Sequence, residues 1–205
     1  MAAFFPELAD EFLTVNFLEK AGAKFHFGEE QAAEIRAVAE AMLPVIRKEA
    51  FWMRQACLVK NWRQAQNYGT EYENVVMSLG TGVDLLQDSY SKQGFLLQSY
   101  IVEVLAGELL MRGYDAYNRH MIEHEKKHVA RYHFPGSEDK LPLAMLPGLL
   151  KGMTPRITCN ESFCMQPQKS VVFIAELTQD ETVFCKGICA GCQRRSCTNR
   201  TEELL

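Results

Sequence analysis

The chain has 205 residues, of which 47% are hydrophobic and 23% charged, and its formal net charge is −4. This composition is ordinary for a globular protein, and a chain of this length can bury a full core without disulfide staples. The negative net charge argues against a molecule that binds nucleic acid through its overall field.

The predicted elements begin with helices. Segment 28–50 has apolar residues at helical spacing and acidic residues in its first turn. Segment 51–61 mixes aromatic and β-branched residues, which fits either a strand or a continuation of the helix. A short strand over 73–82 ends at a glycine-rich turn, and we expect a helix over 83–93.

The longest helical pattern covers 94–132, and its first half is almost entirely apolar, so we expect that half to be central and buried. Segment 133–140 has the composition of a loop, and 141–153 has that of a helix. Strands are expected over 156–163, 170–177 and 181–188. The predicted fold class is therefore α+β, with helices packed around a twisted antiparallel sheet and a short cysteine-rich tail.

The sequence favours neither a secreted nor a membrane-spanning protein. The first residues include Glu7, Asp10 and Glu11 and carry no basic leader, unlike a secretory signal peptide. Apolar runs such as VVFIA are far too short to cross a bilayer. We expect a soluble, cytoplasmic protein that binds neither membranes nor nucleic acid.

The chain contains seven cysteines, which a reducing cytosol does not pair into disulfides. Cys57 stands alone and is predicted to be a small buried hydrophobic residue. The C-terminal cysteines are crowded together in a C-x2-C-x4-C pattern preceded by one more: Cys185, Cys189, Cys192 and Cys197. Such clustering favours a metal over disulfides, although free thiols on a tail are the alternative. Zinc and an iron–sulfur cluster both fit, and the spacing does not choose between them. We predict a domain over 1–184 and a metal-binding tail over 185–205.

A second candidate metal site is the sequence HEKKH, which begins at His124 and ends at His128. Histidines four residues apart on a helix share one face and could bind zinc, with Glu125 as a general base. His120 extends this face, and Glu161 could add a ligand. This zinc-hydrolase hypothesis competes with a simpler interpretation, a solvated helix end with Glu–Lys pairs.

Two further stretches are informative in combination. "RYHFPGSEDKLPL" covers 131–143 and "NESFCMQPQKSV" covers 160–171. Taken singly, they describe a surface loop and a strand–turn–strand. Together with the tail "CAGCQRRSCTNR", and in this order, they resemble the activation (reactivation) domain of vitamin-B12-dependent methionine synthase. The resemblance is greater to the short stand-alone members of that family, and it covers about 70–205.

The resemblance implies a fold, a ligand and partners. It implies helices around a twisted antiparallel sheet that binds S-adenosylmethionine (AdoMet) and presents its methyl group to a corrinoid whose cobalt is in the inactive Co(II) state. The cobalamin would be supplied by a partner methyltransferase or corrinoid protein. One electron would come from a low-potential donor, and an iron–sulfur cluster in the tail is one candidate for it.

The resemblance also assigns residues to the AdoMet site, and it leaves the catalytic residues unknown. The assigned residues are Asp115, Arg131, Pro135, Gly136, Ser137, Glu161 and Ser162. Two of them depart from the family pattern: the family has a tyrosine at the position of Ser137, and its arginine lies one residue closer to the proline than Arg131. An alternative is therefore a binding or electron-transfer module of the same fold that has lost its AdoMet site.

Overall fold

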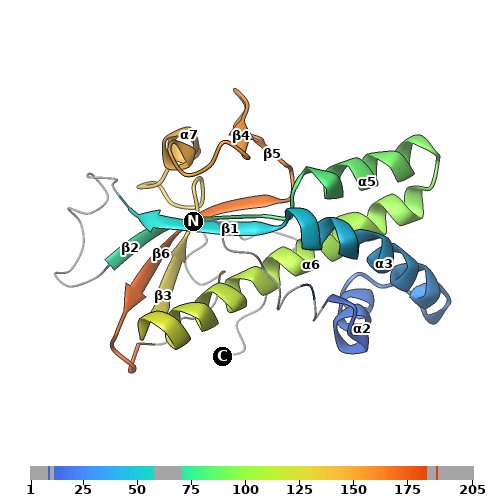
Figure 1. The fold of residues 1–205 in the computed structure, drawn as a ribbon, viewed down its shortest axis with the longest axis horizontal. Helices are drawn as coiled ribbons and strands as arrows, with labels where there is room; N and C mark the ends of the chain where they lie inside the picture. The colour runs from blue at the N-terminus through green and yellow to red at the C-terminus, as the bar shows by residue number, and fades with distance from the viewer. Residues whose placement is uncertain (1–8, 10–11, 58–70, 184–187, 189–205) are drawn as a thin grey trace.

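The computed structural model describes residues 9, 12–57, 71–183 and 188. In this part of the chain, a four-stranded antiparallel sheet has helices on one side and a short helix and β-hairpin on the other (Figure 1). The predicted α+β class is confirmed. Among the helices of the described residues, none has both the length and the apolar composition that crossing a membrane requires.

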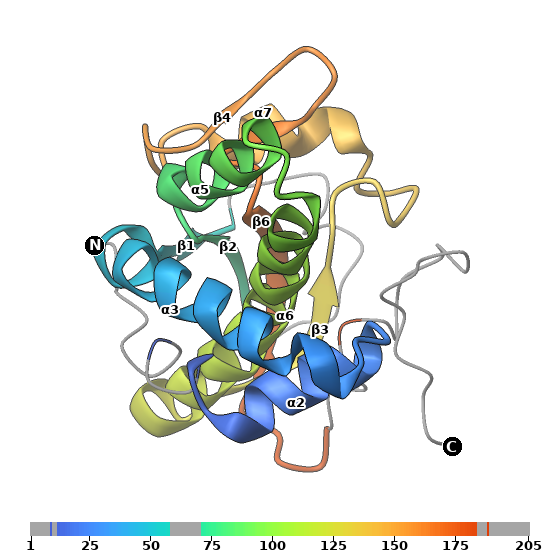
Figure 2. The same cartoon turned by 90° about the vertical axis from the view of Figure 1, so that its right-hand side faces the viewer.

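The larger helices lie on one side of the sheet, where α6 rests against the strands and the others pack around it (Figure 2). Their bounds are α2 (Val15–Lys24), α3 (Ala32–Glu49), α5 (Thr81–Lys92) and α6 (Leu96–His120). The 3-10 turn η1 (Glu29–Gln31) leads into α3, so the helix predicted over 28–50 is confirmed, as is the helix predicted over 83–93. Helix α2 was not predicted; its N-cap is Thr14, whose Oγ1 accepts the N–H of Phe17 at 3.3 Å.

The sheet has the order β1-β2-β6-β3. Its strands are β1 (Phe51–Ala56), β2 (Glu71–Ser78), β3 (His128–His133) and β6 (Ser170–Thr178). On β6, Phe173 and Ala175 pack on the α6 side, whereas Val172 and Ile174 pack on the opposite side. Because both faces of this strand are covered, its sequence is a nearly continuous apolar run rather than an alternation.

The second side of the sheet is covered by a shorter set of elements. These are the 3-10 turn η3 (Leu143–Met145), helix α7 (Leu146–Leu150), and the hairpin of β4 (Thr158–Cys159) and β5 (Met165–Gln166). The helix predicted over 141–153 and the strand predicted over 156–163 are thus present but much shorter. Residues 181–183 form no strand, and most of the remainder of that predicted strand lies outside the described residues.

The predicted helix over 94–132 is wrong in its last part. Helix α6 ends at His120, a π-helical turn η2 (Met121–Glu125) follows, and Lys126 has a left-handed backbone with φ 54°. The chain then reverses into β3, and the Asn118 Oδ1 accepts the N–H of Val129 at 2.8 Å. Pairing along β6 supplies the ladder hydrogen bonds that outweigh the local helical pattern.

The burial predicted for the first half of this helix is only partly correct. The stretch from Ile101 to Leu109 contributes most of the buried side chains of α6. The first turn is exposed instead, with Leu96 at 69% and Tyr100 at 48% of their full accessibility. The start of α6 therefore projects beyond the sheet, in the hairpin that it forms with α5 (Figure 1).

The turn between β2 and α5 depends on a glycine. Gly80 has φ +89°, and a Cβ placed on it would lie 2.4 Å from the Cβ of Glu49. We expect Gly80→Ala to lower the free energy of unfolding by about 1–3 kcal/mol, since it adds a clash to a strained backbone conformation. Gly107→Ala is the matched control: it lies within α6 with no atom near its added Cβ, and should stabilise the protein by about 0.5–1 kcal/mol. Equal effects of the two changes in urea unfolding would contradict this explanation.

Candidate functional site

The edge strand β3 carries a cluster of charged side chains on the face turned toward α7. His133 is 3% exposed, and its Nδ1 lies 2.8 Å from the Glu138 Oε1 while its Nε2 lies 3.1 Å from the Glu176 Oε2. Arg131 opposes Glu176 in the strand register and places its Nη2 3.5 Å from the same Glu138 oxygen. A neutral imidazole has one N–H, so only the imidazolium form donates to both carboxylates.

The loop after β3 is held by its own hydrogen bonds. The N–H of Gly136 donates to the carbonyl of Leu141 at 2.7 Å, and the Ser137 hydroxyl donates to the carbonyl of Phe134 at 2.7 Å. Gly136 has φ +83°, a conformation that side chains other than glycine rarely adopt. The loop therefore presents an exposed Gly136 to solvent, while the hydroxyl of Ser137 turns back into it.

The second motif forms the turn between β4 and β5. The Asn160 Oδ1 accepts the N–H groups of Ser162 at 3.0 Å and Cys164 at 2.9 Å, which closes the turn. Glu161 and Ser162 are exposed at its tip, and Phe163 is turned inward with φ 60°. Glu161 and Ser162, which the resemblance assigns to a ligand site, are thus accessible to a ligand from solvent.

The structure brings these two loops onto one side of the sheet. Leu141 at the end of the first loop, Ile157 beside the hairpin and Ile174 of β6 belong to one buried cluster, against which Phe163 packs. Asp115 comes from the other side: it is exposed on α6, where its neighbour Tyr114 packs against Tyr132 of β3. The assigned residues therefore lie on both sides of the sheet, and among the described residues no hydrogen bond or ion pair links Asp115, Arg131 and Glu161.

The structure contradicts the basis of the zinc-hydrolase hypothesis. His124 lies in η2 and stacks on His120 with ring centroids 4.4 Å apart, whereas His128 lies beyond the left-handed Lys126, in β3. The Nε2 of His128 is 2.6 Å from the carbonyl oxygen of Val183. The helix on which both histidines would share a face ends before them. Within the described residues, no three His, Cys, Asp or Glu side chains are grouped to hold a metal ion.

Glu125, the predicted general base, instead belongs to an ion-pair network. It pairs with Arg54, whose Nη1 is also 3.1 Å from Glu73, and Tyr117 donates its hydroxyl to Glu73 at 3.0 Å. Burial, reinforced by the nearby carboxylate of Glu73, raises the pKa of Tyr117 well above its usual value. The hydrogen bond from Arg54 lowers the pKa of Glu125. This network joins β1 and β2 to the end of α6, so its role is structural.

Three of the cysteines are described, and among the described residues none of them forms a disulfide. Cys57 is fully buried, which confirms the prediction for it, Cys159 is half-buried, and Cys164 is exposed. The four cysteines of the predicted metal-binding tail, Cys185, Cys189, Cys192 and Cys197, lie outside the described residues. Zinc or iron–sulfur binding there stays a prediction, as does the boundary between the domain and the tail.

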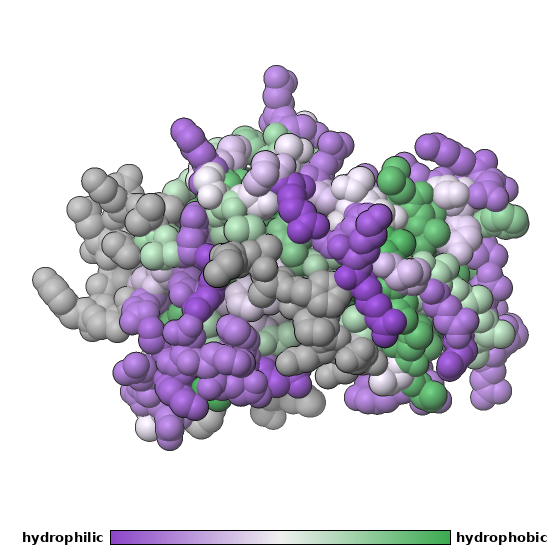
Figure 3. Space-filling model, viewed as in Figure 1, coloured by the Kyte–Doolittle hydropathy of each residue, from purple (hydrophilic) through white to green (hydrophobic). Residues whose placement is uncertain are grey.

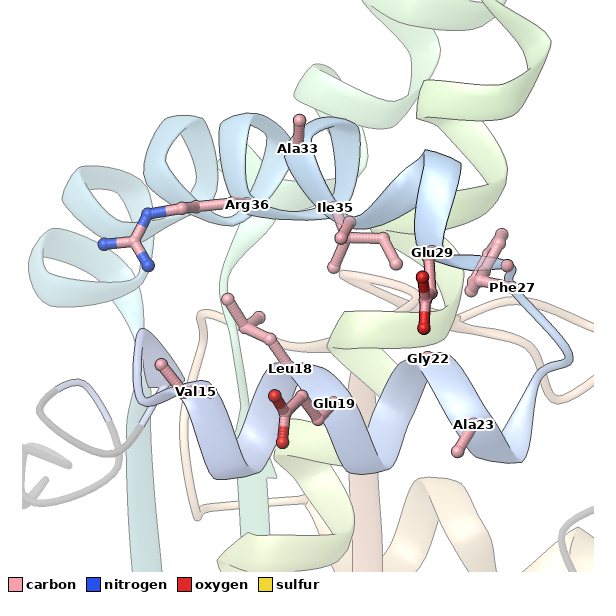
Figure 4. A pocket seen from close by; sticks show the side chains of 12 residues that line it. Val15, Leu18, Glu19, Gly22, Ala23, Phe27, Glu29, Ala33, Ile35 and Arg36 are labelled. Carbon is pink, nitrogen blue, oxygen red and sulfur yellow. The ribbon is translucent and has the colours of Figure 1, made fainter.

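A large cavity lies away from these motifs, between α2 and α3 (Figure 4). It has a volume of about 580 Å³, and Leu18 and Ile35 face it from opposite helices, with the carboxylates of Glu19 and Glu29 beside it. Figure 3 shows a band of apolar residues on this half of the molecule, where Figure 1 places α2, α3 and the α5–α6 hairpin. Nothing in the structure indicates what would cover this surface.

Comparison with known proteins supports the fold and leaves the family open. No protein-family model and no curated protein matches the chain. A crystal structure of the MetH reactivation domain bound to AdoHcy is similar, with a TM-score of 0.50 and 11% sequence identity, over 90% of this chain and 79% of that one. At this identity, the similarity shows a shared fold: helices and a twisted antiparallel sheet in the arrangement of the MetH reactivation domain.

Sequence reasoning missed three residues of the charged cluster: His133, Glu138 and Glu176. A signal was present in one case, because Glu176 interrupts an otherwise apolar run in β6. His133 was missed because its segment was predicted to be a loop, and a loop has no fixed face. Their association depends on the pairing of β3 with β6, which no local pattern specifies.

The Arg54–Glu125 pair predicts a pH effect on stability. The pKa of Glu125 is lower in the folded protein than in the unfolded chain, so the pair stabilises the fold above the ordinary glutamate pKa of 4.5 and loses this effect as the pH falls. We expect Glu125→Gln to be less stable than wild type at neutral pH and to converge with it in acid. Glu123→Gln, which changes a carboxylate of the same turn that is not paired with Arg54, should run parallel to wild type. A constant difference between Glu125→Gln and wild type from pH 7 to pH 3 would contradict the assignment.

Proposed function

We propose that this protein binds AdoMet beside β3 and acts as a stand-alone reactivation-type protein for a corrinoid-dependent methyltransferase. The observation that carries the proposal is the placement of its two matching loops. In a fold shared with a domain that binds AdoHcy, the 134–141 loop and the Asn160–Cys164 turn lie on the same side of one sheet. The two motifs are distant in sequence, and a position on one side of the sheet is a condition for their sharing a ligand site.

The charged side chains of this region suit a ligand that carries both a negative and a positive group. Arg131 is 46% exposed and its 3.5 Å contact with Glu138 is long, so its guanidinium remains available to a ligand carboxylate. The carboxylates of Asp115 and Glu161 are exposed and could attract an ammonium or sulfonium group. Pro135 and Gly136 allow a close approach to the loop backbone, and Ser162 offers a short polar side chain at the tip of the β4–β5 turn.

The reaction class follows from the ligand. Breaking the bond between the AdoMet sulfur and its methyl carbon leaves both bonding electrons on sulfur and yields neutral AdoHcy. The methyl group then needs an electron pair from the acceptor, which a Co(II) corrinoid provides after a one-electron reduction. The corrinoid comes from the partner, and the electron comes from a low-potential donor. We place this exchange in the cytoplasm, and the role of this chain is to hold and orient AdoMet at the edge of the sheet.

The loss of the family tyrosine favours one alternative. Ser137 provides no aromatic face, and its hydroxyl is engaged within its own loop. A protein that had kept the fold but lost AdoMet could serve as a binding or electron-transfer module. The two functions differ in whether AdoMet binds in the absence of a partner.

Calorimetric titration of AdoMet and AdoHcy into the anaerobically purified protein tests the proposal. We expect saturable binding that Arg131→Ala and Glu161→Ala each weaken roughly tenfold or more, since a hydrogen bond to a charged group contributes about 1.5–3 kcal/mol. Arg36→Ala and Glu40→Ala remove an exposed ion pair on α3 and should leave the affinity unchanged. Absence of binding at millimolar AdoMet would refute the proposal and favour the alternative module.

A further inference from the structure

A buried amide interrupts the apolar face of the sheet beneath α7. Asn74 lies in the middle of β2, between Tyr72 and Val76 on the same face, and is 4% exposed. Its Oδ1 is buried and has no hydrogen-bond partner among the described residues. A buried, unpaired amide oxygen is destabilising, so this position is costly unless a bound molecule provides a donor.

The amide of Asn74 borders a pocket between the sheet and the η3–α7 segment. The pocket has a volume of about 320 Å³, at the lower end of the range for small-molecule sites. Asn74 and Gln55, which face each other across β1 and β2, line it from the sheet. Met145, Gly148 and Leu149 line it from η3 and α7, and the exposed Lys151 is the one charged residue among the described residues that line it.

These features define a class of ligand. A carboxamide offers a donor beside an acceptor, the pattern that matches the N6 and N7 edge of adenine. Met145 and Leu149 provide apolar and polarisable surfaces for the faces of a flat ring. The ammonium group of Lys151 favours an anionic substituent on that ring. We propose that this pocket binds an adenine nucleotide through Asn74, with its phosphate toward Lys151.

This site is separate from the one proposed beside β3. Strand β6 lies between β2 and β3, and the fully buried Ile174 opposes Asn74 on one side and His133 on the other. Leu141, also fully buried, belongs to the apolar cluster of this face. The positive charge of Lys151 also suits a phosphate better than the sulfonium of AdoMet. The inference therefore does not depend on the proposed function.

The test uses AMP as the probe, titrated into the full chain by calorimetry. We expect saturable binding that is weakened at least tenfold by Asn74→Leu. Gly148→Leu should have a similar effect, because it fills the pocket from α7 where no atom lies near an added Cβ, and it leaves Asn74 intact. Purine riboside 5′-monophosphate, which lacks the exocyclic amine, should bind roughly fivefold or more weakly than AMP. Arg131→Ala should bind AMP like wild type.

Thermal unfolding of the ligand-free proteins separates binding from folding. Asn74→Leu replaces an unpaired amide by an apolar side chain on an apolar face, so we expect a higher Tm together with the loss of AMP binding. Three results would overturn the proposal: no AMP binding to wild type at millimolar concentration, binding that depends on Arg131 rather than Asn74, or unchanged AMP affinity in Asn74→Leu. The last result would mean that a water molecule alone satisfies the amide.

Discussion

The fold depends on β6 being covered on both faces and paired along both edges. Its hydrogen bonds run to β2 on one side and β3 on the other, and its side chains point alternately into the core beneath α6 and the core beneath α7. Burying both faces of one strand joins two hydrophobic clusters that would otherwise be separate. The loops that carry the candidate AdoMet residues are positioned only because both are anchored to the second of these clusters.

Polar side chains placed on this sheet mark the regions that apolar packing does not explain. On the edge strand, His133 lies between two carboxylates and near the guanidinium of Arg131. On the inner strand, Asn74 faces a pocket without a protein partner among the described residues. In the first group, His133 contacts both carboxylates and so helps to orient the loop that carries Glu138. In the second, the Oδ1 of Asn74 has no partner among the described residues, and this is the ground for proposing a ligand there. This difference is why the two positions support different proposals.

The proposed function depends on whether two proteins that share this fold also bind the same ligand. The similarity to the MetH reactivation domain covers most of this chain, but the identity of 11% means that it concerns the backbone arrangement. The case for AdoMet therefore comes from particular side chains: an accessible arginine, exposed carboxylates and a glycine that lets a ligand approach. The feature that weighs against AdoMet binding is Ser137, whose hydroxyl donates to the carbonyl of Phe134 within its own loop.

The sequence by itself determined the α+β class, the helices α3 and α5, the buried Cys57 and the apolar strand β6, because these depend on local periodicity and composition. It also indicated that the segments 131–143 and 160–171 belong to one family pattern. Only the tertiary structure decided that helix α6 ends before His124, because cross-strand bonds to β6 outweigh local helical preference. It likewise decided which residues meet: the cluster around His133 and the pocket at Asn74 are assembled from strands distant in sequence, and long-range pairing leaves no periodic signal.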